Sequence, residues 1–339
     1  MKKERLQNSI SGSVFTLPVC SVITILLLLA PFADVAGTLQ SIPFWGKLSI
    51  VALTTYVMIE LNNRNTLLRI RSRMVSSVWL VIIGAVAHVC HTTTPPSLLS
   101  FLNGSLDMAL LCSLFMAISF SQLFRTYQQR DCVVCTFHYA LFLGITSIFL
   151  PHSVVFLPMF LWHQTAFLRS TTLRTFCASL IGFFFPWFFI AAWCMVTDNY
   201  QPILTWYADL TGYVLLAESN YTSLSLQQIA SWSLVSLLGI VGSVHYLSTS
   251  YNDKIQVRMF FYIFVIQFFS IDAFVALQPQ HFNSWMPLLV LHSSPIIAHF
   301  FALTRSWFTN FLFMLSMMAV VALAYVNIFM EAVPFTLKP

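Results

Sequence analysis

The residues of this sequence that could do chemistry are a few ionisable side chains inside long apolar runs or at their ends. Asp107 and Asp272 each stand within such a run, and Asp34 follows the first run. An ionisable side chain in hydrocarbon is costly, so each one raises a functional hypothesis. A carboxylate beside a substrate hydroxyl can act as a general base, and these three aspartates are therefore the candidate catalytic residues.

A second set of polar residues could bind a substrate. His292 and Ser293 precede Pro295 in an apolar run, and a proline there leaves one backbone carbonyl without its helical partner. His88 lies at the end of another run, on the side predicted for Asp34. Together with the aspartates, these residues predict a cavity open to one side of the membrane. They could equally be interfacial groups paired with neighbouring serines and asparagines, and the sequence leaves both interpretations open.

The segment 60–73 carries four arginines between two apolar runs. Three of them, Arg64, Arg71 and Arg73, are candidate binding residues for anionic lipid headgroups, which attract each nearby basic residue by ~1 kcal/mol. The preference of lysine and arginine for the cytoplasmic side of a membrane explains the same cluster without a ligand. Both interpretations remain open at this point.

The sequence predicts no metal site and no cofactor. Cys132 and Cys135 form a Cys-x-x-Cys pair, but a zinc site would need two more ligands and a redox site would need a βαβ context. Because these two cysteines are predicted to face the cytoplasm, we expect them to be free thiols. The sequence has no His-Glu-x-x-His spacing and no glycine-rich phosphate loop.

Composition places these residues in a membrane protein. Of the 339 residues, 58% are hydrophobic and only 8% are charged, whereas a soluble domain carries about 25% charged residues. Lipid must therefore be the main solvent of the chain, and membrane lipids are its first expected partners. The net charge of +5 comes from short, separated basic clusters, which argues against nucleic-acid binding.

Apolar runs of about 20 residues are long enough to cross a bilayer as helices. The chain has about eleven such runs, with ten to twelve as the range, and they predict an all-α polytopic bundle forming a single membrane domain over residues 1–339. The fifth and sixth runs could instead form a re-entrant pair. The predicted spans are 13–32, 43–61, 74–91, 103–123, 134–150, 153–168, 175–196, 228–248, 259–278, 284–303 and 307–330.

The basic residues predict which side each loop faces. With the N-terminus in the cytoplasm, fourteen of the sixteen lysines and arginines fall in cytoplasmic segments, and only Lys47 and Lys338 lie outside. The first span is expected to stay uncleaved, because Asp34 interrupts the small-residue site that signal peptidase requires. The outer loop 197–227 mixes aromatic and aliphatic residues, which predicts an interfacial helix that rests on headgroups or covers a substrate.

Three features between residues 60 and 200 suggest a relationship to known proteins: the Leu-Asn-Asn turn at 61–63, the Arg-Ser-Arg entry at 71–73, and the run from 178 to 186. In these features the chain resembles an uncharacterised family of bacterial polytopic inner-membrane proteins. The resemblance implies a location in the bacterial inner membrane, with other envelope proteins as unidentified partners. It implies no particular activity.

Three functions from different classes fit the sequence. The first is handling of an envelope lipid or a polyprenyl-linked glycan at the outer face, with a lipid-linked sugar as substrate. Enzymes of this plan usually carry an acidic motif on a long first outer loop, whereas loop 33–42 here holds only Asp34. The second is a transporter or flippase that uses Asp272 and His292 as coupling groups. The third is a non-catalytic scaffold subunit, which fits the low number of charges within the spans.

Overall fold

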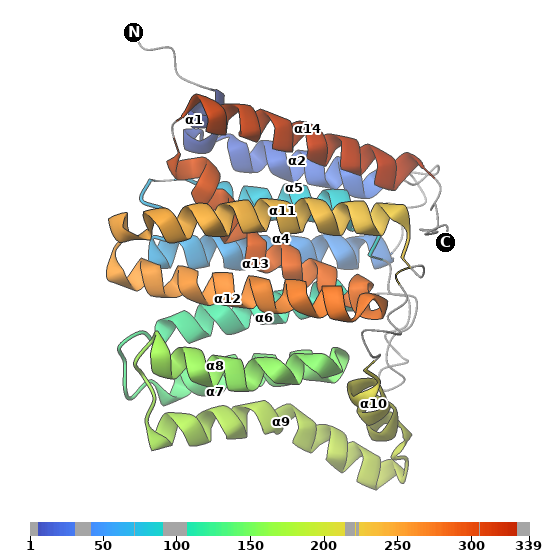
Figure 1. Cartoon of the computed structure of the whole chain (residues 1–339). Coiled ribbons are helices and arrows are strands. Elements are labelled where there is room, and N and C mark those ends of the chain that lie inside the picture. The colour runs from blue at the N-terminus through green and yellow to red at the C-terminus, as the bar shows by residue number, and fades with distance from the viewer. Residues whose placement is uncertain are drawn as a thin grey trace. The chain divides into compact units, whose positions relative to one another are not determined.

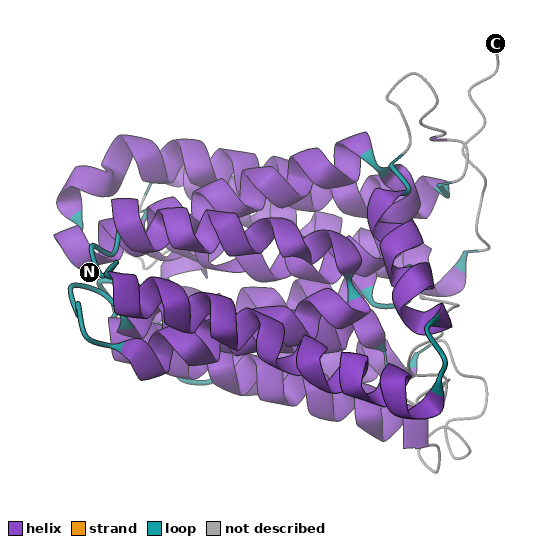
Figure 2. Cartoon of the chain, turned by 90° about the horizontal axis from the view of Figure 1, so that it is seen from below, coloured by secondary structure: helices purple, strands orange, loops and turns teal. Residues whose placement is uncertain are grey.

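The computed structural model describes residues 6–30, 42–70, 72–90, 107–213, 221, 224–304 and 306–330. Over these residues the secondary structure is helical and contains no β-strand, as Figure 2 shows, which confirms the all-α fold class. The chain divides into two compact units. Unit 1 combines Met1–His91 with Leu216–Pro339, and unit 2 is Thr92–Leu215.

Unit 1 is a bundle of helices drawn from both ends of the chain (Figure 1). The central helix of this unit is α13, which packs against α5, α11 and α12 and is almost entirely buried. The outermost face includes α14, which leaves large apolar side chains exposed, as lipid contact requires. The elements are α1(Leu6–Gly12), α2(Thr16–Leu29), α4(Ile42–Asn65), α5(Met74–Val86), α11(Leu226–Thr249), η5(Ser250–Asn252), α12(Ile255–Leu277), η6(Pro279–His281), α13(Phe282–Leu303) and α14(Trp307–Phe329).

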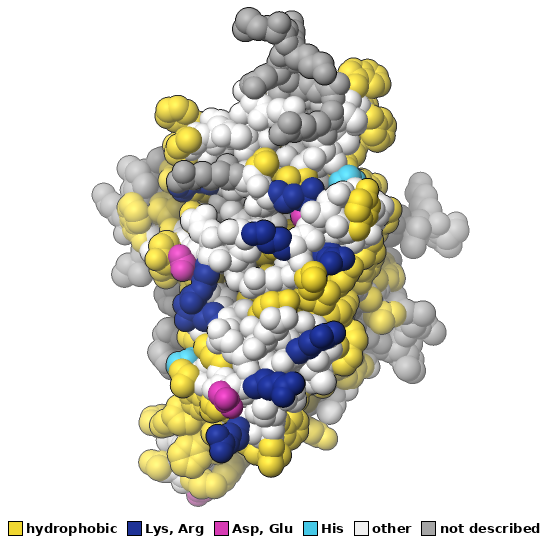
Figure 3. All heavy atoms as spheres, turned by 90° about the vertical axis from the view of Figure 1, so that its left-hand side faces the viewer, with side chains coloured by type: hydrophobic (Ala, Val, Ile, Leu, Met, Phe, Trp, Pro, Cys, Tyr) yellow, Lys and Arg dark blue, Asp and Glu magenta, His cyan; other side chains and the backbone are white. Residues whose placement is uncertain are grey.

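At one end of unit 1, loops that the sequence predicts to be cytoplasmic lie together, and we call this the basic end. Gln7 in α1 donates to the carbonyl oxygen of Phe301 at 2.6 Å, near the end of α13. Ser72, before α5, donates to the carbonyl oxygen of Ser11 at 2.5 Å. The segments that precede α2, α5 and α14 are thus tied to one another by side-chain hydrogen bonds. Figure 3 looks onto this end of the helices, where lysine and arginine side chains appear in dark blue.

At the opposite end of unit 1, loops that the sequence predicts to be outside also contact one another. His88, just after α5, donates from Nε2 to the carbonyl oxygen of Leu27 at 2.8 Å. Gln228 in α11 donates to Asn283 in α13 at 2.8 Å. Within unit 1 the two predicted sets of loops are therefore separated to opposite ends of the bundle.

Unit 2 is built around α7(Val133–Phe149), which packs between α6(Met108–Arg125) and α9(Leu173–Thr197). Two glycines allow α7 and α9 to approach closely. A Cβ at Gly144 would lie 2.3 Å from the carbonyl oxygen of Phe183, and one at Gly182 would lie 2.4 Å from that of Phe137. Small residues at such a crossing allow tight van der Waals packing in lipid, where the hydrophobic effect gives no drive between helices.

The remaining elements of unit 2 are η2(Pro151–Val155), α8(Phe156–Ala166) and α10(Gln201–Thr211). The last of these falls within the loop 197–227, where the sequence predicts an interfacial helix. Trp206 of α10 donates to the carbonyl oxygen of Ser147 at 2.7 Å, which fixes this helix against the end of α7. Its position relative to a membrane surface stays a prediction.

Seven of the described helices are long and apolar enough to cross a membrane, and by length and composition they are those of an integral membrane protein. The bent pair α1 and α2, at 92° to each other, would make an eighth span if it crosses as one element. Apolar helices α5 and α7 are shorter, with 13 and 17 residues. The seven are Pro43–Asn65, Met108–Arg125, Leu173–Thr197, Leu226–Asn252, Ile255–Leu277, Pro279–Leu303 and Trp307–Phe329.

Candidate functional site

A polar cavity of about 1060 Å³ lies at the basic end of unit 1. It is formed by the bend between α1 and α2, the segment from the end of α4 to the start of α5, and the loop between α11 and α12. Arg69, Arg73 and Lys254 line it, together with Asp253 and Asn62. Among the described residues that line the cavity, three are cations and one is a carboxylate.

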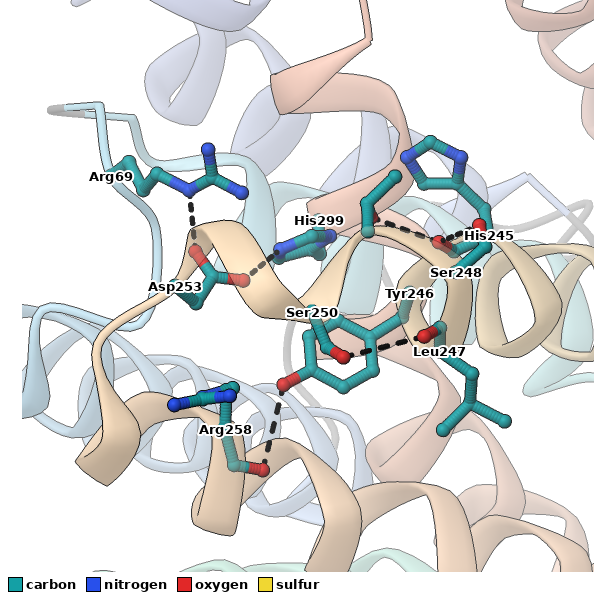
Figure 4. A network of polar contacts seen from close by, with 10 residues as sticks. Arg69, His245, Tyr246, Leu247, Ser248, Ser250, Asp253, Arg258 and His299 are labelled. Atoms are coloured by element: carbon teal, nitrogen blue, oxygen red, sulfur yellow. Dashed lines mark hydrogen bonds and ion pairs between the residues drawn. The ribbon is translucent and has the colours of Figure 1, made fainter.

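Asp253 is the centre of a charged network in this lining (Figure 4). Arg69 donates from Nε to Asp253 Oδ1 at 2.5 Å, and His299 donates from Nε2 to Asp253 Oδ2 at 3.1 Å. Arg69 comes from the segment after α4 and His299 from α13, so the carboxylate joins three parts of unit 1. Both of its oxygens are occupied, and the Asp253 side chain is only 1% exposed.

Local backbone structure places Asp253 in this position. The chain leaves α11 through the short helix η5, and the backbone N–H of Asp253 donates to the carbonyl oxygen of Ser250 at 3.0 Å. Asp253 itself is extended, with φ −91° and ψ 157°, and α12 begins two residues later. This break between the two helices directs the carboxylate inward instead of along a helix surface.

The surroundings of Asp253 hold it in the ionised state. Burial raises the pKa of its carboxyl group, but the hydrogen bonds and charges of His299 and Arg69 outweigh that effect, and the net pKa lies below the ordinary value. The Arg69–Asp253 contact is therefore an ion pair at neutral pH. Among the described residues Arg73 and Lys254 have no carboxylate partner, so the cavity carries an excess of positive charge.

Aromatic packing holds His299 in place. The rings of Tyr246 in α11 and Phe261 in α12 each lie 4.9 Å from the His299 ring, centroid to centroid. Tyr246 in turn donates to the carbonyl oxygen of Arg258 at 3.4 Å, as Figure 4 shows. The charged network at the cavity is thereby connected to the packed interface of α11, α12 and α13.

An apolar groove begins beside the polar cavity. Ile10 and Thr16 line the groove and flank Gly12–Val14, which line the cavity. Met74 of the groove directly follows Arg73 of the cavity. The remaining lining comes from α2, α5, α11, α13 and α14 and is almost entirely apolar. A polar and an apolar site thus lie next to each other on the same bend and the same loop.

The three predicted catalytic aspartates have different environments. Asp34 lies outside the described residues. Asp107 belongs to unit 2, where it is half-buried and caps α6 by accepting from the backbone N–H of Leu110 at 3.4 Å. Asp272 belongs to unit 1 and accepts hydrogen bonds from Trp232 at 2.8 Å and Ser236 at 2.5 Å, both on α11.

The predicted binding residues on helices make contacts within unit 1. His292 is fully buried in α13 and donates from Nδ1 to the carbonyl oxygen of Leu288 at 2.7 Å. Ser293 donates to the carbonyl oxygen of Val290 at 3.1 Å, again within α13. The His88 bond to α2 described above joins helix ends. These contacts are intrahelical or between neighbouring helices.

Of the predicted binding arginines, Arg73 lines the cavity. Arg64 is exposed in the last turn of α4 and does not contribute to the cavity lining. Arg71 lies outside the described residues. The structure therefore places Arg73 beside Arg69, Asp253 and Lys254, which the sequence did not single out as a site.

Sequence reasoning missed the Asp253 network because its members are far apart in the chain. Arg69 and Asp253 are 184 residues apart, and Asp253 and His299 are 46 apart. A signal did exist: Arg69, Asp253 and His299 all occur at predicted cytoplasmic loops or at the inner ends of spans. That shared side makes a contact possible but does not select these partners from the other residues there.

The cysteine prediction needs a correction. Cys132 and Cys135 are paired as a disulfide across the first turn of α7, whereas the sequence predicts two free thiols. Their Cα atoms are 5.5 Å apart, and this spacing suits a disulfide. Within the described part of the chain, no group of three or more His, Cys, Asp or Glu residues could hold a metal ion.

Comparisons of the chain with models of protein families, with curated proteins and with solved structures found no match. The candidate site is accordingly interpreted from its own geometry. An excess of cationic donors with a nearby apolar groove suits an anionic amphiphile, since guanidinium groups match phosphate oxygens in shape and charge.

Proposed function

We propose that this chain is an integral membrane protein that binds a phosphate-bearing lipid or lipid-linked sugar through the basic cavity of unit 1. The observation that carries the proposal is the charge balance of the cavity. Asp253 is already paired with Arg69 and His299, which leaves Arg73 and Lys254 to attract an anion. A phosphate would also reach the guanidinium nitrogens of Arg69 other than Nε, because this side chain is 41% exposed.

The apolar groove favours a lipid over a free phosphate. Its lining residues adjoin those of the cavity in the chain at both the α1–α2 bend and the start of α5. A lipid bound here would place its phosphate in the cavity and a hydrocarbon chain along the groove. The ligand class is one of those expected from the sequence, an envelope lipid or a lipid-linked glycan, but the proposed site is at the basic end instead of the outer face.

For the topology we propose eleven spans, with the N-terminus and the cavity on the cytoplasmic side of a bacterial inner membrane. Each of the eleven predicted apolar runs contains a described helix. The separation of the predicted inner and outer loops of unit 1 to opposite ends of its bundle supports the proposed alternation. The arginine-rich basic end supports a cytoplasmic location for the cavity.

Transport of the same ligand is a second candidate function, and the position of α13 favours it. This helix is the buried centre of unit 1 and contains Pro287 and Pro295, which remove backbone hydrogen bonds inside a span. His299 links its end to the cavity through Asp253. In transporters, spans interrupted by proline often lie at the ligand site.

Binding of a short-chain phosphatidic acid tests the proposal. Full-length protein purified in detergent is titrated with dioctanoyl phosphatidic acid, and binding is followed by native mass spectrometry. We expect Arg73→Gln to weaken binding about tenfold, because a hydrogen bond to a charged group is worth about 1.5–3 kcal/mol.

Arg64→Gln is the matched control, since it removes the same charge from the same segment outside the cavity. Its affinity should stay within about twofold of the original protein, as expected for an exposed charge. Dioctanoylglycerol, which has no phosphate, should not bind measurably. Equal losses in the two variants would indicate general surface attraction and contradict a site at the cavity.

A further inference from the structure

The disulfide between Cys132 and Cys135 lies where a permanent cross-link is unusual. It joins the residue before α7 to the first turn of that helix, in a segment that also contains Arg125 and Arg130. The proposed topology places this segment in the cytoplasm, in keeping with its basic residues. Cytoplasmic thiols are kept reduced, and the disulfides found there are mostly transient bonds with catalytic or redox-sensing roles. This disulfide is therefore a candidate for a bond that forms and breaks.

The first turn of α7 does not depend on the disulfide. Thr136 donates twice to the carbonyl oxygen of Cys132, from its backbone N–H at 3.2 Å and from its hydroxyl at 2.9 Å. These bonds close the turn without the sulfur atoms. The two cysteines have a sequence separation of only 3, and a cross-link that closes so short a loop removes little entropy from the unfolded chain. Breaking the disulfide should therefore leave the fold intact.

The turn between α6 and α7 is also held by other bonds. The backbone N–H of Gln128 donates to the carbonyl oxygen of Leu168 at 2.8 Å, and Ser170 donates to the hydroxyl oxygen of Thr126 at 3.2 Å. Both bonds fix this turn against the segment between α8 and α9. The two cysteines, with Cα atoms 5.5 Å apart, should therefore stay close together when the disulfide opens. Because their effective concentration stays high, the disulfide can form again.

The cysteine pair is open to an incoming thiol. Cys132 and Cys135 are each partly exposed, and Val134 between them is 66% exposed. Arg130 and Asp131 directly precede the pair and are exposed, which places this turn in water, since charged side chains are costly in hydrocarbon. The N-terminus of a helix carries a partial positive charge and favours the thiolate that forms when a disulfide opens. The position of the pair thus suits thiol–disulfide exchange.

We infer that Cys132 and Cys135 form a reversible redox pair that exchanges with cytoplasmic thiols, such as glutathione or a protein dithiol. In reduction, a partner thiolate attacks one sulfur and forms a mixed disulfide, and the other cysteine leaves as a thiolate. A second partner thiolate then breaks the mixed disulfide. The two protein thiolates take up the protons that the partner thiols released, and the partner becomes a disulfide. Oxidation by a partner disulfide is the reverse.

Equilibration with glutathione tests the inference. Full-length protein in detergent, starting from oxidised and from reduced samples, is incubated in buffers of different [GSH]²/[GSSG]. Free thiols are then alkylated, and mass spectrometry counts them in the tryptic peptide 131–169, which contains no other cysteine. We expect one transition from ~10% to ~90% oxidised over about a hundredfold change in that ratio, as for a two-electron exchange with glutathione.

Single-cysteine variants show whether glutathione reaches the pair. Cys132→Ser and Cys135→Ser each leave one cysteine without its internal partner. In oxidised glutathione, at least one of them should carry a glutathione on peptide 131–169, whereas the original protein forms its internal disulfide. Cys177→Ser is the matched control, because Cys177 is an exposed free cysteine on α9 of the same unit. The midpoint of this control should stay within about twofold of the original, as for other surface substitutions.

The titration of the original protein needs no variant, so it stands even if a variant fails to fold. A pair that stays oxidised in reduced glutathione alone would be a permanent cross-link and would overturn the inference. Two free thiols that persist in oxidised glutathione would overturn it as well, and so would the absence of glutathione from both single-cysteine variants.

The inference rests on the proposed topology for its cytoplasmic partner and does not depend on lipid binding. Labelling of the reduced pair in spheroplasts by a membrane-impermeant maleimide would overturn both the cytoplasmic partner and that topology. The phosphatidic acid titration tests a different unit of the chain, so either proposal can fail while the other stands.

Discussion

Two carboxylates of unit 1, Asp253 and Asp272, accept the same number of side-chain hydrogen bonds but belong to different kinds of site. Asp253 accepts from Arg69 and His299, which come from two other parts of the unit. Asp272 accepts from Trp232 and Ser236, which lie one turn apart on the neighbouring helix α11. Asp253 therefore pairs with a cation, Arg69, whereas Asp272 accepts hydrogen bonds from neutral donors.

The difference teaches that an ionisable residue in an apolar run is not by itself a functional site. Asp272 lies inside an apolar helix, where ionisable residues are often functional. Its hydrogen bonds nevertheless join α11 to α12, as those of a structural residue would. Asp253 lies in a loop, and no pattern in the sequence marks it as a candidate site residue. Asp253 lines a cavity that also contains Arg73 and Lys254, two cations with which it is not paired. These cations are available to bind an anionic ligand.

The largest effect is expected from Asp253→Ala. Removing this carboxylate leaves the buried His299 ring without its acceptor and frees Arg69 from its ion pair. Breaking a buried pair on one side costs about 3–5 kcal/mol, and we expect a value near the lower end because Arg69 is partly exposed. Thermal unfolding of the protein in detergent, followed by tryptophan fluorescence, measures the loss.

Glu60→Ala is the control for Asp253→Ala. Glu60 is an exposed carboxylate near the end of α4, in the same unit. Its replacement should change the free energy of unfolding by less than about 0.5 kcal/mol, as for other surface substitutions. If both variants lose the same free energy of unfolding, the Asp253 network does not stabilise the protein more than an exposed carboxylate does.

Acidification should reduce the advantage that the original protein has over Asp253→Asn. The folded-state pKa of Asp253 lies below its ordinary value of 3.8, so its contribution to stability is complete above that pH. As the pH falls below 3.8 toward the folded pKa, the contribution is lost. Unfolding midpoints of the two proteins at pH 6 and pH 3 measure the change, and a constant or widening difference would contradict it.

The smallest effect is expected from Asp272→Asn. The amide oxygen can still accept from Trp232 or Ser236, so α11 and α12 should remain paired. Hydrogen bonds between membrane helices average ~0.6 kcal/mol, and the stability change should stay near that value. Binding of dioctanoyl phosphatidic acid should be unchanged. A tenfold loss of binding would show that Asp272 and the cavity are coupled, and the comparison of the two carboxylates would fail.

Hydropathy predicts the existence of helices much better than their environments. Both α13 and α14 are long, apolar and easily recognised as spans in the sequence. The most apolar window of α13 is 94% buried, whereas that of α14 is 28% buried. His292 and Ser293 lie in the buried helix, and their hydrogen bonds run to their own backbone. The sequence alone could not show which apolar helix would be surrounded by others.

Contacts between loops, like the burial of helices, are not predicted by the sequence alone. The sequence predicts that the segments around Arg69 and Asp253 face the same side, and the structure brings them into contact. Several other basic residues share that predicted side, including Arg64, which stays exposed outside the cavity. The predicted side of each loop therefore limits which residues could contact Asp253, but it does not identify Arg69 as the one that does.

By itself, the sequence determined an all-helical membrane protein, the approximate limits of its helices, and which loops of unit 1 share an end. These properties follow from local composition, since the cost of placing polar or charged groups in hydrocarbon is felt residue by residue. Only the tertiary structure decided that Asp253 joins Arg69 to His299. Such contacts depend on how helices distant in the chain pack together, and no local pattern encodes that packing.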